Sequence, residues 1–212
     1  MTLYKGTMHL PDPPLLVISD RSQALRPIGQ MAAAAFAGGC RWFSLREKDL
    51  DREERRALLE NVMAWARPYN ALVMIHDDID AAIATGAGGV HLPANGDPRA
   101  ARAKLPGKLI GASAHSAAEA ASLIAAGADY VTVSPVFMTE SKPGYGPALG
   151  LDGLAKAVAT ANGPVVALAG ITPVNAAACL KAGAAGIAVM GEVMRATHPD
   201  RAVRALVEAI AG

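Results

Sequence analysis

Aromatic residues are scarce in this sequence, where Phe, Trp and Tyr together make up only 4%. Alanine, glycine and valine are abundant instead, which favours closely packed helices and strands over a β-sandwich. Cysteine is also rare, and the spacing of Cys40 and Cys179 matches neither a disulfide framework nor a metal site. Two isolated cysteines suit a reducing compartment, so we expect a cytoplasmic protein.

An excess of charge of either sign is missing as well. The chain has 20 Lys and Arg against 19 Asp and Glu, so no global field attracts nucleic acid or an anionic membrane surface. No stretch approaches the roughly 20 apolar residues of a membrane span, and the start, MTLYKGTMHLPDPP, does not read as a signal peptide. We therefore expect neither nucleic acid nor a membrane as a partner. The sequence leaves a homo-oligomer open.

A unit of an Ala-rich helical segment, a glycine and a short β-rich run recurs four times, with its helical parts at 33–39, 83–89, 124–129 and 180–186. Each glycine can end a helix in the left-handed conformation and let the chain turn into a strand. Further apolar runs lie at 15–20, 71–77, 109–113 and 164–170.

These runs and units predict eight strands. The runs are nearly continuous rather than alternating, which is typical of parallel strands buried on both faces. One gap between strands holds only a brief helix, at 98–104. With no linker or break in composition, the pattern favours a (β/α)8 TIM barrel, an α/β fold, over a doubly wound open sheet. We expect a single domain over 1–212, with an N-terminal extension at 1–13.

In such a barrel the active site lies at the carboxyl ends of the strands, and polar or glycine residues follow almost every predicted strand here. Arg46 and Lys48 alternate on one strand, so both should point to the same side and Glu47 to the other. The alternative is a solvated strand end. If the two cations converge, they would bind an anion.

A loop after the sixth predicted strand adds a third cation, Lys142, preceded by the hydroxyls of Thr139 and Ser141. Asp77 and Asp78 follow the third strand. These residue types suit a diphosphate held by Lys and Arg together with one hard divalent ion, most simply Mg²⁺.

A second anion site is indicated at the ends of the last two strands, where Gly170 and Gly191 lie. Barrels often bind phosphate there through backbone N–H groups. The alternative is that both glycines only make tight turns. Two anion sites would imply two phosphorylated substrates.

Three histidines, His76, His91 and His115, lie after successive strands. They are compatible with a metal triad, but sequence spacing does not specify that geometry. A general acid or base role for one of them is favoured.

Five segments together resemble the family of thiamine-phosphate synthase and its relative, the thiazole tautomerase, between about residues 15 and 195. They are SLREKD, IHDDIDAAIATGAGGVHL, IGASAHS, DYVTVSPVFMTESKPGYGPALGL and VVALAGITPVNAAACLKAGAAGIAVMGEV. The family fold is a (β/α)8 barrel. In the synthase, a pyrimidine methyl diphosphate ionises while Mg²⁺ holds the pyrophosphate, and the nitrogen of a thiazole phosphate captures the pyrimidine cation.

The resemblance implies a role for each matching position. It assigns diphosphate binding to Arg46, Lys48 and Lys142, a magnesium ligand to Asp77, contacts with substrate or pyrophosphate to Ser113, Thr139 and Ser141, and the thiazole phosphate to Gly170 and the turn at Met190 and Gly191.

Some positions depart from the family pattern. Ser44 stands where the family usually has Gln, and His76 where it has Asn; we expect both, with His115, to contact substrate. The family pattern VHLGQED reads VHLPANGDP here, so the second magnesium carboxylate falls on Gly96. Asp97, displaced by one residue, is the candidate replacement. A Mg²⁺ site that loses a carboxylate should be weaker.

Two alternatives remain beside a synthase. A tautomerase needs neither metal nor diphosphate, but its catalytic histidine would fall on Pro135, so His76 or His115 would have to replace it. The other alternative is a barrel that binds phosphorylated thiamine precursors without turning them over.

Overall fold

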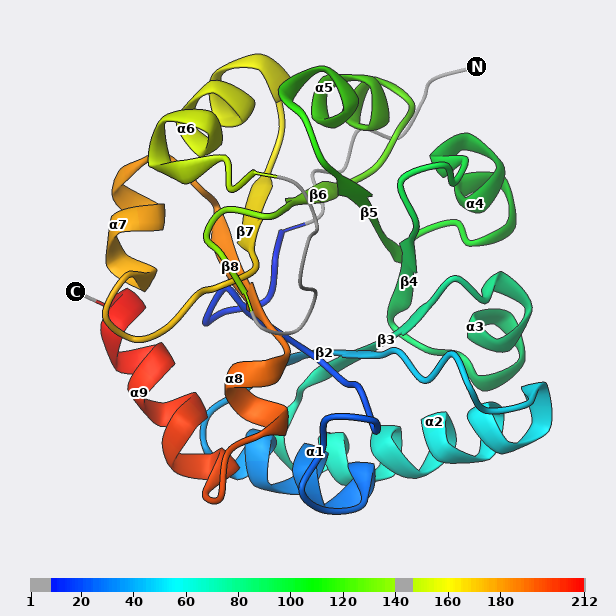
Figure 1. Ribbon diagram of the computed structural model, residues 1–212. Helices are drawn as coiled ribbons and strands as arrows, with labels where there is room; N and C mark the ends of the chain where they lie inside the picture. The colour runs from blue at the N-terminus through cyan, green and yellow to red at the C-terminus, as the bar shows by residue number, and fades with distance from the viewer. Residues whose placement is uncertain (1–8, 140–146, 212) are drawn as a thin grey trace.

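Eight parallel strands form a closed barrel in the order β1 to β8, and helices surround it (Figure 1). This computed structural model describes residues 9–139 and 147–211. Each strand pairs with the next along the chain, and β8 closes the ring by pairing with β1. The predicted (β/α)8 barrel is therefore confirmed.

The strands are short, and the polar residues that follow them lie in loops. Their bounds are β1 Leu15–Ile18, β2 Trp42–Leu45, β3 Leu72–His76, β4 Gly89–Leu92, β5 Leu109–Ala114, β6 Tyr130–Val133, β7 Val165–Leu168 and β8 Gly186–Val189.

Helices connect the strands on the outside, and the brief helix expected at 98–104 is α4. The bounds are α1 Ile28–Ala37, α2 Arg52–Ala66, α3 Ile79–Thr85, α4 Pro98–Lys104, α5 Ala117–Ala125, α6 Gly150–Ala161, α7 Ala176–Lys181, α8 Gly191–Met194 and α9 Pro199–Ala211, with a 3-10 turn, η1, at Arg67–Tyr69.

Glycine ends helices as the repeated unit predicts. Gly86 follows α3 in the left-handed conformation, with φ of 72°, and a β-carbon there would meet no atom within 4 Å. The backbone conformation, rather than a lack of space, therefore requires glycine at this turn.

Strand side chains alternate between two apolar clusters. In β2, Phe43 and Leu45 pack outward among the helices, whereas Trp42 lies in the cluster inside the barrel. Residues inside the barrel fill its interior, as is usual for eight strands. This filling forms a floor, and a cavity opens above it, at the carboxyl ends of the strands.

Tyr130 of β6 is one of the large side chains buried inside the barrel. Its ring meets Trp42 edge-on, with centroids 4.7 Å apart. A β-carbon at Gly111 on the neighbouring strand β5 would lie 2.1 Å from Cζ of Tyr130, so only glycine leaves room for this ring. The glycine thus lets the phenol oxygen of Tyr130 reach across the interior.

Within the part of the chain that the structure describes, no helix is long and apolar enough to cross a membrane.

Candidate active site

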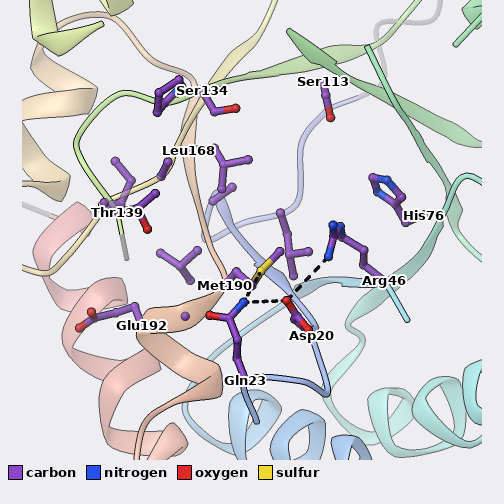
Figure 2. Close-up of a pocket in the computed structure, with 18 of the residues that line it drawn as sticks. Asp20, Gln23, Arg46, His76, Ser113, Ser134, Thr139, Leu168, Met190 and Glu192 are labelled. Atoms are coloured by element: carbon purple, nitrogen blue, oxygen red, sulfur yellow. Dashed lines mark hydrogen bonds and ion pairs between the residues drawn. The ribbon is translucent and has the colours of Figure 1, made fainter. Parts of the chain in front are cut away.

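A cavity of about 510 Å³ opens at the carboxyl ends of the strands, and all eight strands or the loops after them contribute to its lining. Its size is typical of small-molecule sites. Figure 2 shows Arg46 and His76 on one side of it and Thr139 and Glu192 on the opposite side.

Arg46 and Lys48 both line the cavity, whereas Glu47 between them does not. The expected alternation therefore continues past the end of β2. The backbone N–H of Arg46 donates to Oγ of Ser19 at 2.9 Å, and the buried Glu47 accepts from the N–H of Arg21 at 2.8 Å. Burial raises the pKa of Glu47 above its ordinary value. These contacts hold the backbone at Arg46 and the side chain of Glu47, which lies between the two cations.

Asp20 connects this cationic side to the loop after β1. Its Oδ2 lies 3.8 Å from Nη1 of Arg46 and accepts from Nε2 of Gln23 at 2.6 Å, and the same Nε2 lies 3.4 Å from Sδ of Met190 (Figure 2). Burial, the largest influence, acts to raise the pKa of Asp20, but hydrogen bonds from Ser22 and Gln23 and the charge of Arg46 together hold it below its ordinary value. Asp20 is therefore an anion that orients Arg46.

His91 lies at the cavity floor, with only 2% of its surface exposed. Its Nδ1 is 2.9 Å from the phenol oxygen of Tyr130, and its Nε2 is 3.0 Å from Oγ of Ser113. Burial, with a smaller contribution from Arg46, lowers the pKa of His91 to about 4. The ring is therefore neutral at physiological pH.

His115 follows β5 and has a defined tautomer. Its Nδ1 lies 2.9 Å from the carbonyl oxygen of Ser134. Because a carbonyl only accepts hydrogen bonds, Nδ1 carries the hydrogen and Nε2 is the basic nitrogen of the neutral ring. His115 also lines the cavity.

The backbone turns sharply at Gly170, after β7. Ala169 and Gly170 have φ values of 80° and 66°, and a β-carbon at Gly170 would lie 2.5 Å from the carbonyl oxygen of Met138. Asn175 holds the turn, since its Nδ2 donates to the carbonyl of Gly170 and its Oδ1 accepts from the N–H of Thr172. Only glycine fits at this position. The loop backbone at Gly170 therefore lies directly at the cavity.

Gly191 begins the short helix α8 and also lines the cavity. Arg195, at the end of that helix, folds back over Gly191 and donates to Oε1 of Gln23. Glu192 lines the same side, so a carboxylate lies beside the expected phosphate site.

Most residues that the sequence singled out meet in this cavity. Those that line it are Arg46, Lys48, His76, His91, Ser113, His115, Thr139, Gly170, Met190 and Gly191. Ser141 and Lys142 lie outside the described residues.

Ser44 does not reach the cavity lining. It is buried on β2, in register with Ile18 and Met74, and its Oγ has no hydrogen-bond partner within the described chain. Because alternate residues of a strand share a side, Ser44 points inward like Trp42, but it lies below the open space.

The expected pair of magnesium ligands is not assembled in the cavity lining. Oδ1 of Asp97 caps α4 by accepting from the N–H groups of Arg99 and Ala100 at 2.9 and 3.3 Å. Asp77 is exposed and has a φ of 53°. Within residues 9–139 and 147–211, no group of three or more His, Cys, Asp or Glu is placed to hold a metal ion.

Asp78 has a structural role. It caps α3 through the N–H of Ala81 at 2.9 Å and forms a 2.7 Å ion pair with Arg55. Both partners of the ion pair are largely buried, so the carboxylate of Asp78 is used by the helix cap and the ion pair.

Sequence reasoning assigned no site role to Asp20, Gln23, Glu192 or Arg195. Asp20 carried a signal, since it is the polar last residue of the first predicted strand run. The sequence carried no such signal for Gln23 and Arg195, because their position at the cavity depends on how the loop after β1 contacts α8.

A closed (β/α)8 barrel with cations and glycine turns around one cavity belongs to the class of barrels that bind phosphorylated small molecules. The family model described as thiamine monophosphate synthase matches residues 15–193. The chain belongs to the thiamine monophosphate synthase family, which confirms the resemblance seen in the sequence.

Curated relatives agree with this assignment. A putative thiamine-phosphate synthase of Geobacter sulfurreducens is 41% identical over 198 residues, covering 91% of this chain and 92% of the relative. A thiamine-phosphate synthase of Chlorobium luteolum is 40% identical over 203 residues, with 94% of each chain covered. These relatives support the transferase function in thiamine biosynthesis.

Among solved structures, thiamine phosphate pyrophosphorylase from Pyrococcus furiosus superposes with a TM-score of 0.83 at 35% identity, covering 93% of this chain and 96% of that one. A KDPGal structure at 20% identity has a TM-score of 0.74, a likeness that concerns the fold alone.

Proposed function

We propose that this cavity joins a pyrimidine methyl diphosphate to a thiazole phosphate, forming thiamine phosphate and releasing pyrophosphate. The observation that carries the proposal is the placement of two kinds of anion-binding group in one cavity. The side chains of Arg46 and Lys48 come from the loop after β2, and the turns at Gly170 and Gly191 come from the loops after β7 and β8.

Arg46 and Lys48 would bind the diphosphate. Asp20 lies near the guanidinium of Arg46, and Ser19 holds its backbone N–H, so the cation is oriented before substrate arrives. Thr139 lies on the opposite side of the cavity, where its hydroxyl can bind a phosphate oxygen. Ser141 and Lys142 are proposed to complete this set.

The thiazole phosphate would lie at the glycine turns. The absence of side chains at Gly170 and Gly191 lets the backbone N–H groups approach an anion. Arg195 adds a cation at the same turn. Glu192 opposes binding of a second phosphate dianion, and Arg195 offsets part of its charge.

In the reaction, the bond between the pyrimidine methylene carbon and the diphosphate oxygen breaks, and its electron pair leaves with pyrophosphate. The lone pair of the thiazole nitrogen forms the new carbon–nitrogen bond. No proton has to move in these steps. The chain therefore contributes mainly by stabilising charge and by holding the two substrates in line.

Magnesium is proposed to enter with the diphosphate. Mg²⁺ is commonly held by one or two carboxylates together with substrate phosphates and water. Asp77 is the carboxylate we propose for it, since Asp97 is used as a helix cap. A bound ion would neutralise part of the charge on the diphosphate. We also propose that the altered loop around Gly96 makes this chain bind Mg²⁺ weakly.

The two cysteines are buried thiols within the described chain, which agrees with a cytoplasmic location, and we keep that location as part of the proposal. A homo-oligomer likewise remains a proposal.

The direct test is pyrophosphate release by purified protein given both substrates and Mg²⁺, with EDTA as control and thiamine phosphate identified as the product. The variant Lys142→Ala should lose most of this activity if its assignment is right, because the leaving pyrophosphate would lose a cation. Folded wild-type protein that binds both substrates but releases no pyrophosphate would leave the non-catalytic binder in its place.

A thiazole tautomerase is the second candidate, and His115 is the observation that favours it. Its Nε2 is the basic nitrogen of a residue that lines the cavity, and this position suits a general base. Metal-independent exchange of a ring-bound proton of the thiazole phosphate with solvent deuterium, abolished by His115→Gln, would support this candidate. Synthase turnover that is unchanged in His115→Gln would argue against a role of His115 in the main reaction.

A further inference from the structure

Four side chains form a buried row beneath the cavity, from Trp42 to Met74, Tyr130 and His91. Nε1 of Trp42 donates to Sδ of Met74 at 3.0 Å. The phenol oxygen of Tyr130 lies 3.6 Å from the same sulfur and 2.9 Å from Nδ1 of His91. All four are nearly fully buried, so solvent does not compete for these bonds.

The position of the Tyr130 hydrogen follows from these distances. A thioether sulfur is a weak acceptor, and the sulfur of Met74 already accepts from Trp42. An imidazole nitrogen is a much better acceptor, and Nδ1 of His91 is also closer. Tyr130 therefore donates to Nδ1.

This donation determines the tautomer of His91. Burial disfavours the charged ring, so His91 is neutral and carries a single hydrogen. If Nδ1 accepts from Tyr130, that hydrogen is on Nε2. Nε2 lies 3.0 Å from Oγ of Ser113 and 3.4 Å from Oγ1 of Thr132, so Ser113 is its main acceptor.

We propose that His91 is a positioning residue that, held by Tyr130 as the Nε2-protonated tautomer, makes Ser113 a hydrogen-bond donor into the cavity. The Oγ of Ser113 accepts from His91, which leaves its own hydrogen for the ligand. No other partner engages this hydroxyl within residues 9–139 and 147–211. Ser113 can then donate to a ligand atom that accepts, either an anionic oxygen or an unprotonated ring nitrogen.

This inference deepens the proposed function and rests on it for the identity of the ligand, since both proposed substrates carry such acceptors. The opposite tautomer would have the opposite consequence. With the hydrogen on Nδ1, Nε2 would accept from Ser113, and the serine could then only accept from a ligand. The tautomer therefore decides which ligand groups this part of the cavity selects.

The first test needs no substrate and so stands apart from the proposed reaction. In protein labelled with ¹⁵N-histidine, long-range ¹H–¹⁵N correlation at pH 7 distinguishes the two ring nitrogens, and His91→Gln identifies the signals. We expect Nδ1 to be unprotonated and Nε2 protonated, and the same in Ser113→Ala, because Tyr130 sets the tautomer. Protonation of Nδ1 in the wild type would overturn the proposal.

The second test uses a double-mutant cycle with Tyr130→Phe, which removes the phenol hydroxyl but keeps the ring packed on Trp42. Loss of the neutral hydrogen bond from Tyr130 to His91 should lower kcat/KM about fivefold when Ser113 is present. In the Ser113→Ala background, Tyr130→Phe should change kcat/KM by less than about twofold, because the hydroxyl through which Tyr130 acts on the ligand is missing.

A loss of kcat/KM that is equal in both backgrounds would indicate a merely structural role for Tyr130 and would contradict the proposal. Melting temperatures of all four proteins show whether folding is preserved. If no protein turns over substrate, the proposed function fails, and the tautomer measurement still decides the assignment of His91.

Discussion

The guanidinium of Arg195 covers Gly191 so closely that a β-carbon at Gly191 would lie 2.4 Å from Nη1 of Arg195. The obstacle is the far end of a flexible side chain, so Gly191→Ala should displace Arg195 and break its hydrogen bond to Gln23 without unfolding the protein. We expect the affinity for a phosphate ligand to fall about tenfold, equivalent to one charge-assisted hydrogen bond. Calorimetric titration with thiazole phosphate measures this.

The double variant Gly191→Ala with Arg195→Ala separates the two causes. If the effect acts through Arg195, the double variant should bind no more weakly than Arg195→Ala alone. Additive losses would show instead that the methyl group itself blocks the ligand.

Replacing Arg46 should impair catalysis more than replacing an exposed arginine does. Arg46→Ala removes a guanidinium that lines the cavity and leaves Asp20 without its cation, so we expect kcat/KM to fall about 10- to 100-fold. Arg56→Ala is the matched control, because Arg56 is exposed on α2 and the ion pair it forms among the described residues is with the neighbouring Glu60. Steady-state assays of pyrophosphate release compare them, and equal activities would refute the assignment of Arg46.

The two aspartates that the sequence singled out for magnesium, Asp77 and Asp97, should respond differently to loss of charge. Asp97→Asn keeps a side-chain acceptor for the cap of α4, so stability and the Mg²⁺ concentration at half-maximal activity should not change. Asp97→Ala should lower the free energy of unfolding by about 1 kcal/mol. Asp77→Asn should raise the Mg²⁺ concentration at half-maximal activity. A raised requirement in Asp97→Asn would identify Asp97 as a metal ligand.

Glu47 should make the stability of the protein depend on pH. Burial raises its folded-state pKa above the ordinary value of 4.5, so the folded protein holds this proton more tightly than the unfolded chain. The resulting stabilisation is fully present below pH 4.5 and is lost as pH rises through the folded-state pKa. Urea unfolding at a series of pH values should show that the wild type loses stability relative to Glu47→Gln as pH rises. A difference that does not depend on pH would contradict this.

Features that depend on local periodicity could be predicted from the sequence. The two-residue period of a strand is enough to place Arg46 and Lys48 together and Glu47 apart from them. The cap at Asp97 was not predicted, although Asp followed by Pro is a common start of a helix. The metal role expected for Asp97 came from the resemblance, and the cap competes with it for the same carboxylate.

Contacts across the barrel could not be predicted in this way. His91 and Tyr130 are 39 residues apart, and their contact depends on the stagger of the strands and on the space left at Gly111. The depth of Ser44 depends on the same stagger. A strand pattern shows which side a residue faces but not its height above the barrel floor.

The pairing of β1 with β8 has a consequence for how the protein is made. β1 leaves the ribosome first, yet one of its two edges gains its partner only when β8 has been synthesised, since Leu16 pairs with Ala188. Until then the nascent sheet has two open edges, which are templates for pairing with other chains. The closed ring is therefore protected from such pairing only once it is complete, and chains that stall before β8 should be prone to aggregate.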